Sequence, residues 1–95
     1  MFNQAKMVMK LKKAQKELAK EVVEVTAGDG AVTVQVTGEL KLKNVKLDPE
    51  LIDFDDINEL ERWIEVAVRD AMARAQEVAA EKMKPLMGGL GNLGL

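Results

Sequence analysis

Lysine side chains recur at intervals of three and four residues through the first twenty positions of the chain. The row consists of Lys6, Lys10, Lys13, Lys16 and Lys20. An ammonium group binds a phosphate oxygen as a point charge, so such a row can hold the backbone of a nucleic acid while reading little of its sequence. Charged residues are equally typical of the solvent-exposed face of an ordinary helix. The spacing alone leaves both interpretations open.

Charge is distributed unevenly along a chain of 95 residues whose formal net charge is −2. Residues 1–20 contain six lysines and one glutamate, whereas residues 48–61 contain seven acidic residues and no basic one. Between them lie Lys41, Lys43 and Lys46, which add to the basic surface. A polyanion responds to the local potential, because salt screens charges over about 8 Å at physiological ionic strength. The acidic total therefore does not exclude a nucleic acid as partner.

The side chains that most enzymes use as nucleophiles and proton shuttles are missing from the sequence. It contains no histidine, cysteine, tyrosine or serine, so enzymatic activity is not expected. Without cysteine there is no disulfide or thiolate metal site, which fits a reducing compartment. Neither a signal peptide nor a run of eighteen apolar residues is present, so we expect a cytoplasmic protein with no membrane contact.

The stretch "DFDD", residues 53–56, offers three carboxylates to a hard cation such as magnesium or calcium. It lacks the glycine and the closing glutamate of a calcium loop, and it comes directly before a helical pattern. Aspartate is favoured at helix starts, where backbone N–H groups have no partner within the helix. We therefore predict capping, and we expect neither a metal nor a cofactor.

The elements that must position these groups follow from hydrophobic periodicity. An apolar stripe at helical spacing, Met7, Leu11, Ala14 and Leu18, predicts an N-terminal helix with the lysines on its opposite side. From residue 22 to 47 the period changes to two, which predicts three antiparallel strands joined by turns at residues 27–31 and 38–39. The alternation fails near Lys43, which indicates a bulge in the third strand.

A second, longer helix follows, with Asp55 or Asp56 as its N-cap and an end near Lys84. At 1.5 Å per residue it measures roughly 40 Å, about twice the length of a strand, so it must overhang the sheet. We expect a second copy of the chain to bury the excess apolar surface. The predicted dimer interface consists of Trp63, Ile64, Val66, Val68 and Met72. Half-burial in the protomer is an equally good interpretation of Trp63.

The resulting fold class is α+β, an α-β-β-β-α protomer with a three-stranded antiparallel meander. Residues 1–84 are predicted to form one domain. Residues 85–95 begin with proline and continue with glycine and leucine without periodicity, so they are expected to form a flexible tail.

Several stretches together resemble the YbaB/EbfC family of nucleoid-associated proteins. They are "KKAQKELAKE" on the first helix, "AGDGAVTVQVTGE" across the hairpin, "VKLDPEL" after the third strand and "LERWIEVAVRDAMARAQEVAAEKM" on the long helix. The resemblance covers most of the chain. It implies a symmetric homodimer whose helices project as arms, bind duplex DNA and coat the bacterial chromosome in the nucleoid.

The same resemblance implies which residues contact DNA, since the helical arms do so in that family. By position these are Lys6, Lys10, Lys13, Lys16, Lys20, Arg69, Arg74, Lys82 and Lys84. A rival hypothesis is a protein-interaction module, in which the projecting helices and the Gly/Leu tail recruit a partner protein. The sequence therefore favours a non-enzymatic, phosphate-binding homodimer and keeps a scaffold module as the alternative.

Overall fold

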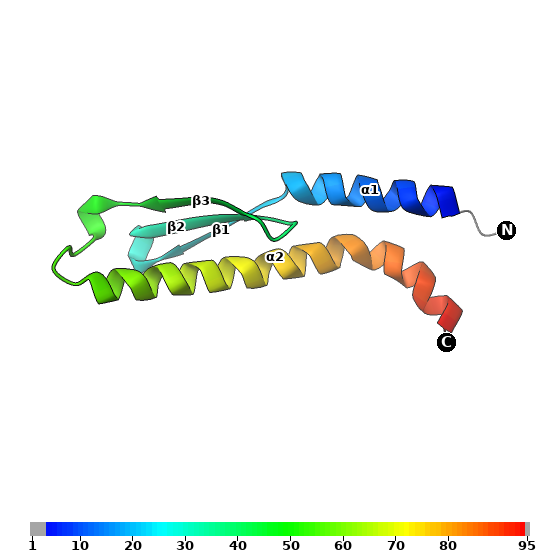
Figure 1. Ribbon diagram of the computed structural model, residues 1–95. Helices are drawn as coiled ribbons and strands as arrows, with labels where there is room; N and C mark the ends of the chain where they lie inside the picture. Colours follow the sequence, from blue (N-terminus) through cyan, green and yellow to red (C-terminus); the bar gives the residue numbers. More distant parts are fainter. Residues whose placement is uncertain (1–3, 95) are drawn as a thin grey trace.

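The helices and strands follow one another in the predicted order, α-β-β-β-α (Figure 1). The computed structural model describes the backbone of residues 4–94 and the side chains of residues 4–85. The elements are α1 (Gln4–Lys20), β1 (Val22–Ala27), β2 (Val32–Thr37), β3 (Leu42–Leu47) and α2 (Ile57–Gly94), with short 3₁₀ turns η1 (Gly28–Gly30) and η2 (Pro49–Leu51).

The three strands form an antiparallel sheet in the order β1-β2-β3. The turn between β1 and β2 needs glycine, because Gly28, Asp29 and Gly30 all have positive φ, at 62°, 56° and 99°. On the other side of β2, Gln35 pairs with Asn44 and Val36 pairs with Leu42, which leaves Lys43 unpaired. Both the hairpin and the bulge predicted from the sequence are confirmed.

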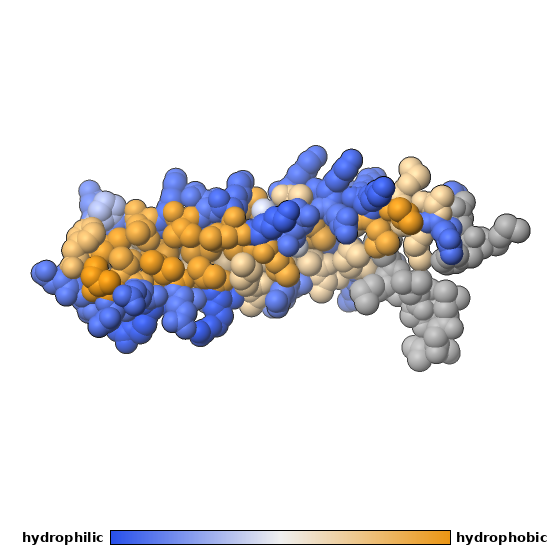
Figure 2. Space-filling view, viewed as in Figure 1, coloured by the Kyte–Doolittle hydropathy of each residue, from blue (hydrophilic) through white to orange (hydrophobic). Residues whose placement is uncertain are grey.

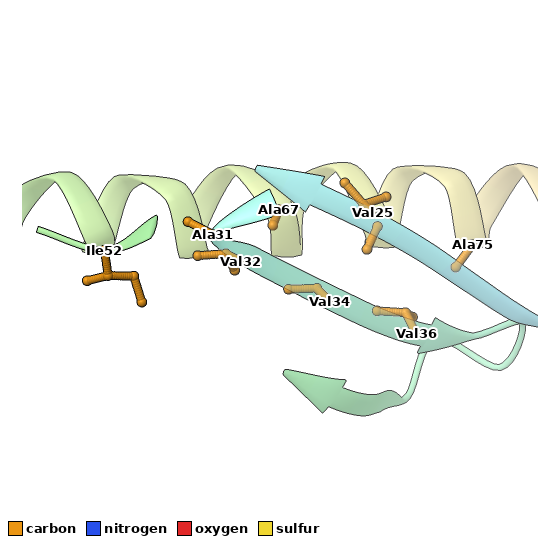
Figure 3. Packing of buried hydrophobic residues seen from close by; sticks show 9 residues of the cluster. Val25, Ala31, Val32, Val34, Val36, Ile52, Ala67 and Ala75 are labelled. Carbon is orange, nitrogen blue, oxygen red and sulfur yellow. The ribbon is translucent and has the colours of Figure 1, made fainter. Parts of the chain in front are cut away.

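The core lies between β2 and one face of α2 (Figure 3). Val32, Val34 and Val36 alternate along β2 and have no exposed surface. They meet a stripe of small residues on α2, which includes Ala67 and Ala71 and is equally buried. Small side chains let the helix approach the sheet closely. The helix packs across β1 and β2, and every residue of β3 remains exposed.

A side-chain cap begins α2 at the predicted place. The Oδ1 atom of Asp56 accepts a hydrogen bond from the backbone N–H of Glu59 at 3.1 Å, which satisfies one of the donors left open at the helix start. The Oδ1 atom of Asp53 accepts from the N–H of Asp55 at 2.9 Å. The capping interpretation of residues 53–56 is therefore confirmed, with Asp56 as the N-cap.

The predicted end of the second helix near Lys84 is wrong. The helix continues through Pro85 to Gly94, and Figure 1 shows it changing direction toward this end. A proline inside a helix removes one hydrogen bond and pushes against the carbonyl four residues earlier, which kinks the helix without necessarily ending it. The division into a domain over residues 1–84 and a flexible tail over residues 85–95 stays a prediction.

Beyond the sheet, α1 packs antiparallel to α2. Of the predicted apolar stripe of α1, Ala14 and Leu18 are buried, whereas Leu11 remains 36% exposed. Its C-terminal end is held on the sheet because the N–H of Gly38 donates to the carbonyl of Leu18 at 3.0 Å, and a Cβ at Gly38 would lie only 2.8 Å from that oxygen. We call residues 4–21, which comprise α1 and Glu21, together with residues 76–85 of α2 the arm. It makes the molecule elongated, with extents of 65 × 25 × 15 Å.

Candidate nucleic-acid interface

The lysines of α1 remain in solvent, as the sequence predicted. Every member of the predicted row is exposed: Lys6, Lys10, Lys13, Lys16 and Lys20. Hydrophilic side chains cover the outer side of the arm (Figure 2). Lys12, which is outside the predicted set, is also exposed and lines a shallow depression with Met9, Lys13 and Lys16. The arm thus presents six ammonium groups from α1.

One predicted residue of α2, Lys82, joins this basic surface. Lys10, Lys13 and Lys82 line a groove of about 230 Å³ between the two helices, beside Pro85. The groove also holds Glu17, whose Oε2 atom lies 2.9 Å from Nζ of Lys82. This ion pair ties the helices of the arm together.

The Glu17–Lys82 pair shifts the pKa of both groups. The hydrogen bond from Lys82 and its positive charge lower the pKa of the Glu17 carboxyl, and the nearby charges of Lys13 and Lys20 add to the effect. The hydrogen bond to Glu17 raises the pKa of the Lys82 ammonium group. The pair fixes how the two helices of the arm are aligned. Both side chains are substantially exposed, so the pair contributes little to the free energy of unfolding.

The structure separates Arg69 and Arg74 from the lysines of α1, whereas Lys84 lies on the arm. Arg69 forms an ion pair with Glu65 on the surface of α2. Arg74 lines a second groove, of about 440 Å³, beside Glu24 and Asp70 at the β1 edge. Two carboxylates in this groove make it a poor place for a phosphate. Lys84 is exposed near the end of the arm.

The arm collects positive charge although the chain as a whole is acidic. Residues 4–21 and 76–85 contain eight lysines and four glutamates, a net charge of +4, and the rest of the chain carries −6. The acidic segment 48–61 lies at the opposite end of the molecule from α1 (Figure 1). The basic and acidic segments, which are separate in the sequence, therefore also lie at opposite ends of the molecule.

An uncovered apolar surface runs along β3. Leu42, Val45 and Leu47 pair with Val36, Val34 and Val32, so they lie on the same side of the sheet as α2. Their exposed fractions are nevertheless 54%, 38% and 46%, because α2 covers β1 and β2 instead. Figure 2 shows hydrophobic residues gathered in a band between β3 and α2. We call this band the β3 face.

The residues predicted for the dimer interface divide between the two flanks of α2. At 100° per residue, Val68 and Met72 lie opposite Asp70 and Arg74, which line the groove beside β1. Val68 and Met72 therefore border the β3 face. Both, like Ile64, are half-buried against the protomer's own core.

Trp63 and Val66 lie away from the β3 face. Trp63 is half-buried over the β1–β2 turn, where a Cβ on Gly28 would fall 2.5 Å from the indole ring. Trp63 is therefore partly buried in the protomer, and its place in a dimer interface stays a prediction. Val66 is 44% exposed. Leu42, Val45 and Leu47 were not identified from the sequence as an exposed apolar row. The available signal was their apolar character on a strand otherwise rich in lysine.

The described residues contain neither a metal site nor a membrane-spanning helix. Among residues whose side chains are placed, no group of three carboxylates lies close enough together to hold a metal ion. Within the same part of the chain, no helix combines the length and apolar character needed to cross a bilayer.

These features define a small α+β protein with a basic two-helix arm at one end of a three-stranded sheet. Residues 1–90 match the YbaB/EbfC DNA-binding family. The chain belongs to this family, as its sequence motifs predicted.

Relatives of similar length agree with this assignment. A nucleoid-associated protein of Chloroflexus aurantiacus is 42% identical over 87 residues, which cover 92% of this chain and 87% of that protein. A nucleoid-associated protein of Saccharopolyspora erythraea is 46% identical over 96 residues, with 95% and 83% covered. The fold also matches the crystal structure of an uncharacterized protein, HP0035, from Helicobacter pylori, with a TM-score of 0.79, 15% identity and 88% of each chain covered.

Proposed function

We propose that this protein is a non-enzymatic, nucleoid-associated protein that binds duplex DNA as a homodimer in the bacterial cytoplasm. It contacts the phosphate backbone through the arm and reads little of the base sequence. The observation that carries the proposal is the exposed lysine row of α1 on a projecting arm with net charge +4. Family membership and the names of the relatives point to the same ligand.

The chemistry of the arm favours backbone contacts over base readout. Its bases are lysines, which supply point charges and lack the planar fork with which arginine reads guanine. The arginines Arg69 and Arg74 sit outside the arm, each beside a carboxylate. Lys10, Lys13 and Lys82 line the same groove, which supports their contact with the same phosphate.

The β3 face supplies the surface for a second copy. Leu42, Val45 and Leu47 form an apolar row that the protomer leaves in water, and exposed apolar surfaces of this kind mark protein contacts. An isologous contact uses the same patch on both subunits. One self-complementary apolar face per chain therefore suits a symmetric dimer, with Val68 and Met72 at its border and Trp63 and Val66 outside it.

Salt dependence tests the DNA contact. Binding to two unrelated duplexes, measured by fluorescence anisotropy at several salt concentrations, should give similar affinities and a steep log–log slope of about −0.9 per phosphate neutralised. Changing Lys10, Lys13 and Lys16 to glutamate should weaken binding about tenfold or more on both duplexes and flatten the slope by about 2–3. The fold should persist, because these side chains are exposed.

A matched control places the same charge change outside the arm. Lys41, Lys43 and Lys46, all on or next to β3, are replaced by glutamate. These strand lysines were expected to add to the basic surface, so if this variant loses as much affinity as the α1 variant, the arm is not the main contact with DNA. A flat salt response of the unmodified protein would contradict phosphate contact altogether.

The dimer is tested by a charge on the β3 face. Val45→Lys should convert a dimer to a monomer in light scattering and leave the fold intact, since Val45 is already 38% exposed in the protomer. Lys46→Gln is the control, because the next residue of a strand points to the other face. A Val45→Lys protein with the mass of the parent dimer would show that the copies meet elsewhere.

A further inference from the structure

The groove inside the arm contains an acidic group among basic ones. Lys10 and Lys13 enter it from α1, and Lys82 enters it from α2 beside Pro85. Among the described residues that line the groove, Glu17 is the one acid. With Glu17 ionised the four groups carry a net charge of +2, and without its charge they would carry +3.

Glu17 forms an ion pair with Lys82, the lysine of α2 that lines this groove. Its Oε2 atom lies 2.9 Å from Nζ of Lys82. Lys13 precedes Glu17 by one helical turn and Lys20 follows it, and both stabilise its negative charge. The carboxylate thus already takes the place of an anion among these ammonium groups.

We propose that this groove is a phosphate site and that Glu17 regulates it, because a phosphodiester must displace the Glu17 carboxylate from Lys82 to bind there. The inference rests on the proposed function and adds a competing internal anion to it. The ligand class is a phosphodiester of duplex DNA, which like a carboxylate carries one negative charge and accepts charge-assisted hydrogen bonds.

The exchange is feasible because the ion pair is exposed. The side chains of Lys82 and Glu17 are 33% and 43% exposed, and such pairs contribute little stability. Release of Lys82 therefore reduces DNA affinity only modestly, and release of the counterion held by the phosphate compensates for it. What still lowers DNA affinity is the repulsion between the Glu17 carboxylate and the bound phosphate. In water, at a separation of about 7 Å, this repulsion weakens binding roughly threefold.

The decisive variant is Glu17→Gln, which keeps the size and a hydrogen-bond acceptor but removes the charge. It should bind duplex DNA about 3–10-fold more tightly than the parent, because repulsion and ion-pair competition are both relieved. Its salt slope should stay close to that of the parent, since Lys82 neutralises one phosphate in both complexes.

Two further variants separate a local effect from a change in net charge. Glu61→Gln makes the same charge change on an exposed residue of α2, 21 residues or about 30 Å from Lys82, and should leave affinity within twofold of the parent. Lys82→Gln should remove the gain when it is combined with Glu17→Gln. Circular dichroism of each variant confirms that α1 remains helical.

The outcomes distinguish this inference from the proposed function. A parent protein that does not bind DNA overturns the proposed function. A parent that binds, with a Glu17→Gln variant of equal or weaker affinity, overturns the regulated site alone. The inference is also overturned if Glu61→Gln gives the same gain, or if the gain from Glu17→Gln persists without Lys82.

Discussion

Gly28 permits the closest contact between the β1–β2 turn and α2. Its φ is +62°, a left-handed conformation. A Cβ added at this position would lie 2.5 Å from Cδ2 of Trp63 and 2.6 Å from Cε3. Carbon atoms in favourable contact are about 3.5–4.0 Å apart. Alanine at this position would therefore require the indole ring or the turn to move by about 1 Å.

Gly28→Ala should destabilise the protein for two separable reasons. The left-handed conformation costs an L-residue about 1–2 kcal/mol, and overpacking against a side chain costs about 1–3 kcal/mol. The free energy of unfolding should thus fall by about 2–5 kcal/mol. Urea denaturation followed by circular dichroism measures it, at one fixed protein concentration because the proposed dimer would contribute to stability.

A double-mutant cycle with Trp63→Leu isolates the steric part. Leucine removes the ring that Cβ would meet, so Gly28→Ala should cost only about 1–2 kcal/mol in that background. Gly30→Ala is the control, because its Cβ would meet only Cδ1 of Leu51, at 3.8 Å, and its cost should not depend on residue 63. If Gly28→Ala costs the same with tryptophan and with leucine, Trp63 does not pack on this turn.

Three further outcomes follow from local features of the fold. Val34→Ala should lower the free energy of unfolding by about 2–3 kcal/mol, since two methyl groups of a residue with no exposed surface are lost; denaturant titration checks this. Asp56→Ala should cost about 1 kcal/mol through loss of the N-cap, whereas Asp55→Ala should stay within about 0.5 kcal/mol in the same assay. The folded-state pKa of Glu17 lies below its ordinary value of 4.5, so the contact with Lys82 should be complete above pH 4.5 and disappear as the pH falls through that lower pKa; an NMR titration of the Glu17 carboxyl should show a midpoint below 4.5.

Local signals made most of the fold predictable. The alternation of Val32, Val34 and Val36 is a direct consequence of a strand buried on one face, and the break at Lys43 marked the bulge. Asp56 was recognisable as an N-cap because an open N–H group three residues later needs an acceptor. Each of these features depends on residues close in sequence, where propensity and periodicity act.

Features that depend on contacts between distant segments were not predictable in the same way. Periodicity identified an apolar stripe on α2 but not which flank meets β1 and which meets β3, so Trp63 was grouped with Val68. The pairing of Glu17 with Lys82 depends on the register of two helices separated by the whole sheet. The continuation of α2 past Pro85 was missed because a proline inside a helix can kink it without ending it, and the sequence does not tell these two outcomes apart.

The separation of charge along the molecule and the proposed dimer together would let a chain with an isoelectric point near 5.2 hold DNA. The arm carries +4 and the remainder −6, but the molecule is 65 Å long and screening acts over about 8 Å. DNA lying on the arm therefore experiences mainly the charge of the arm. One arm offers few phosphate contacts, whereas two arms on the proposed dimer act on the same duplex at high effective concentration.

The salt slope can show whether both arms of a dimer hold one duplex. If they do, Val45→Lys should halve the slope as well as weaken binding, because the number of phosphates neutralised per complex is halved. Loss of stability alone would not do this, since partial unfolding lowers the active fraction at every salt concentration equally. An unchanged slope in a proven monomer would mean that each arm binds by itself, and the β3 face would then serve assembly without strengthening the contact with DNA.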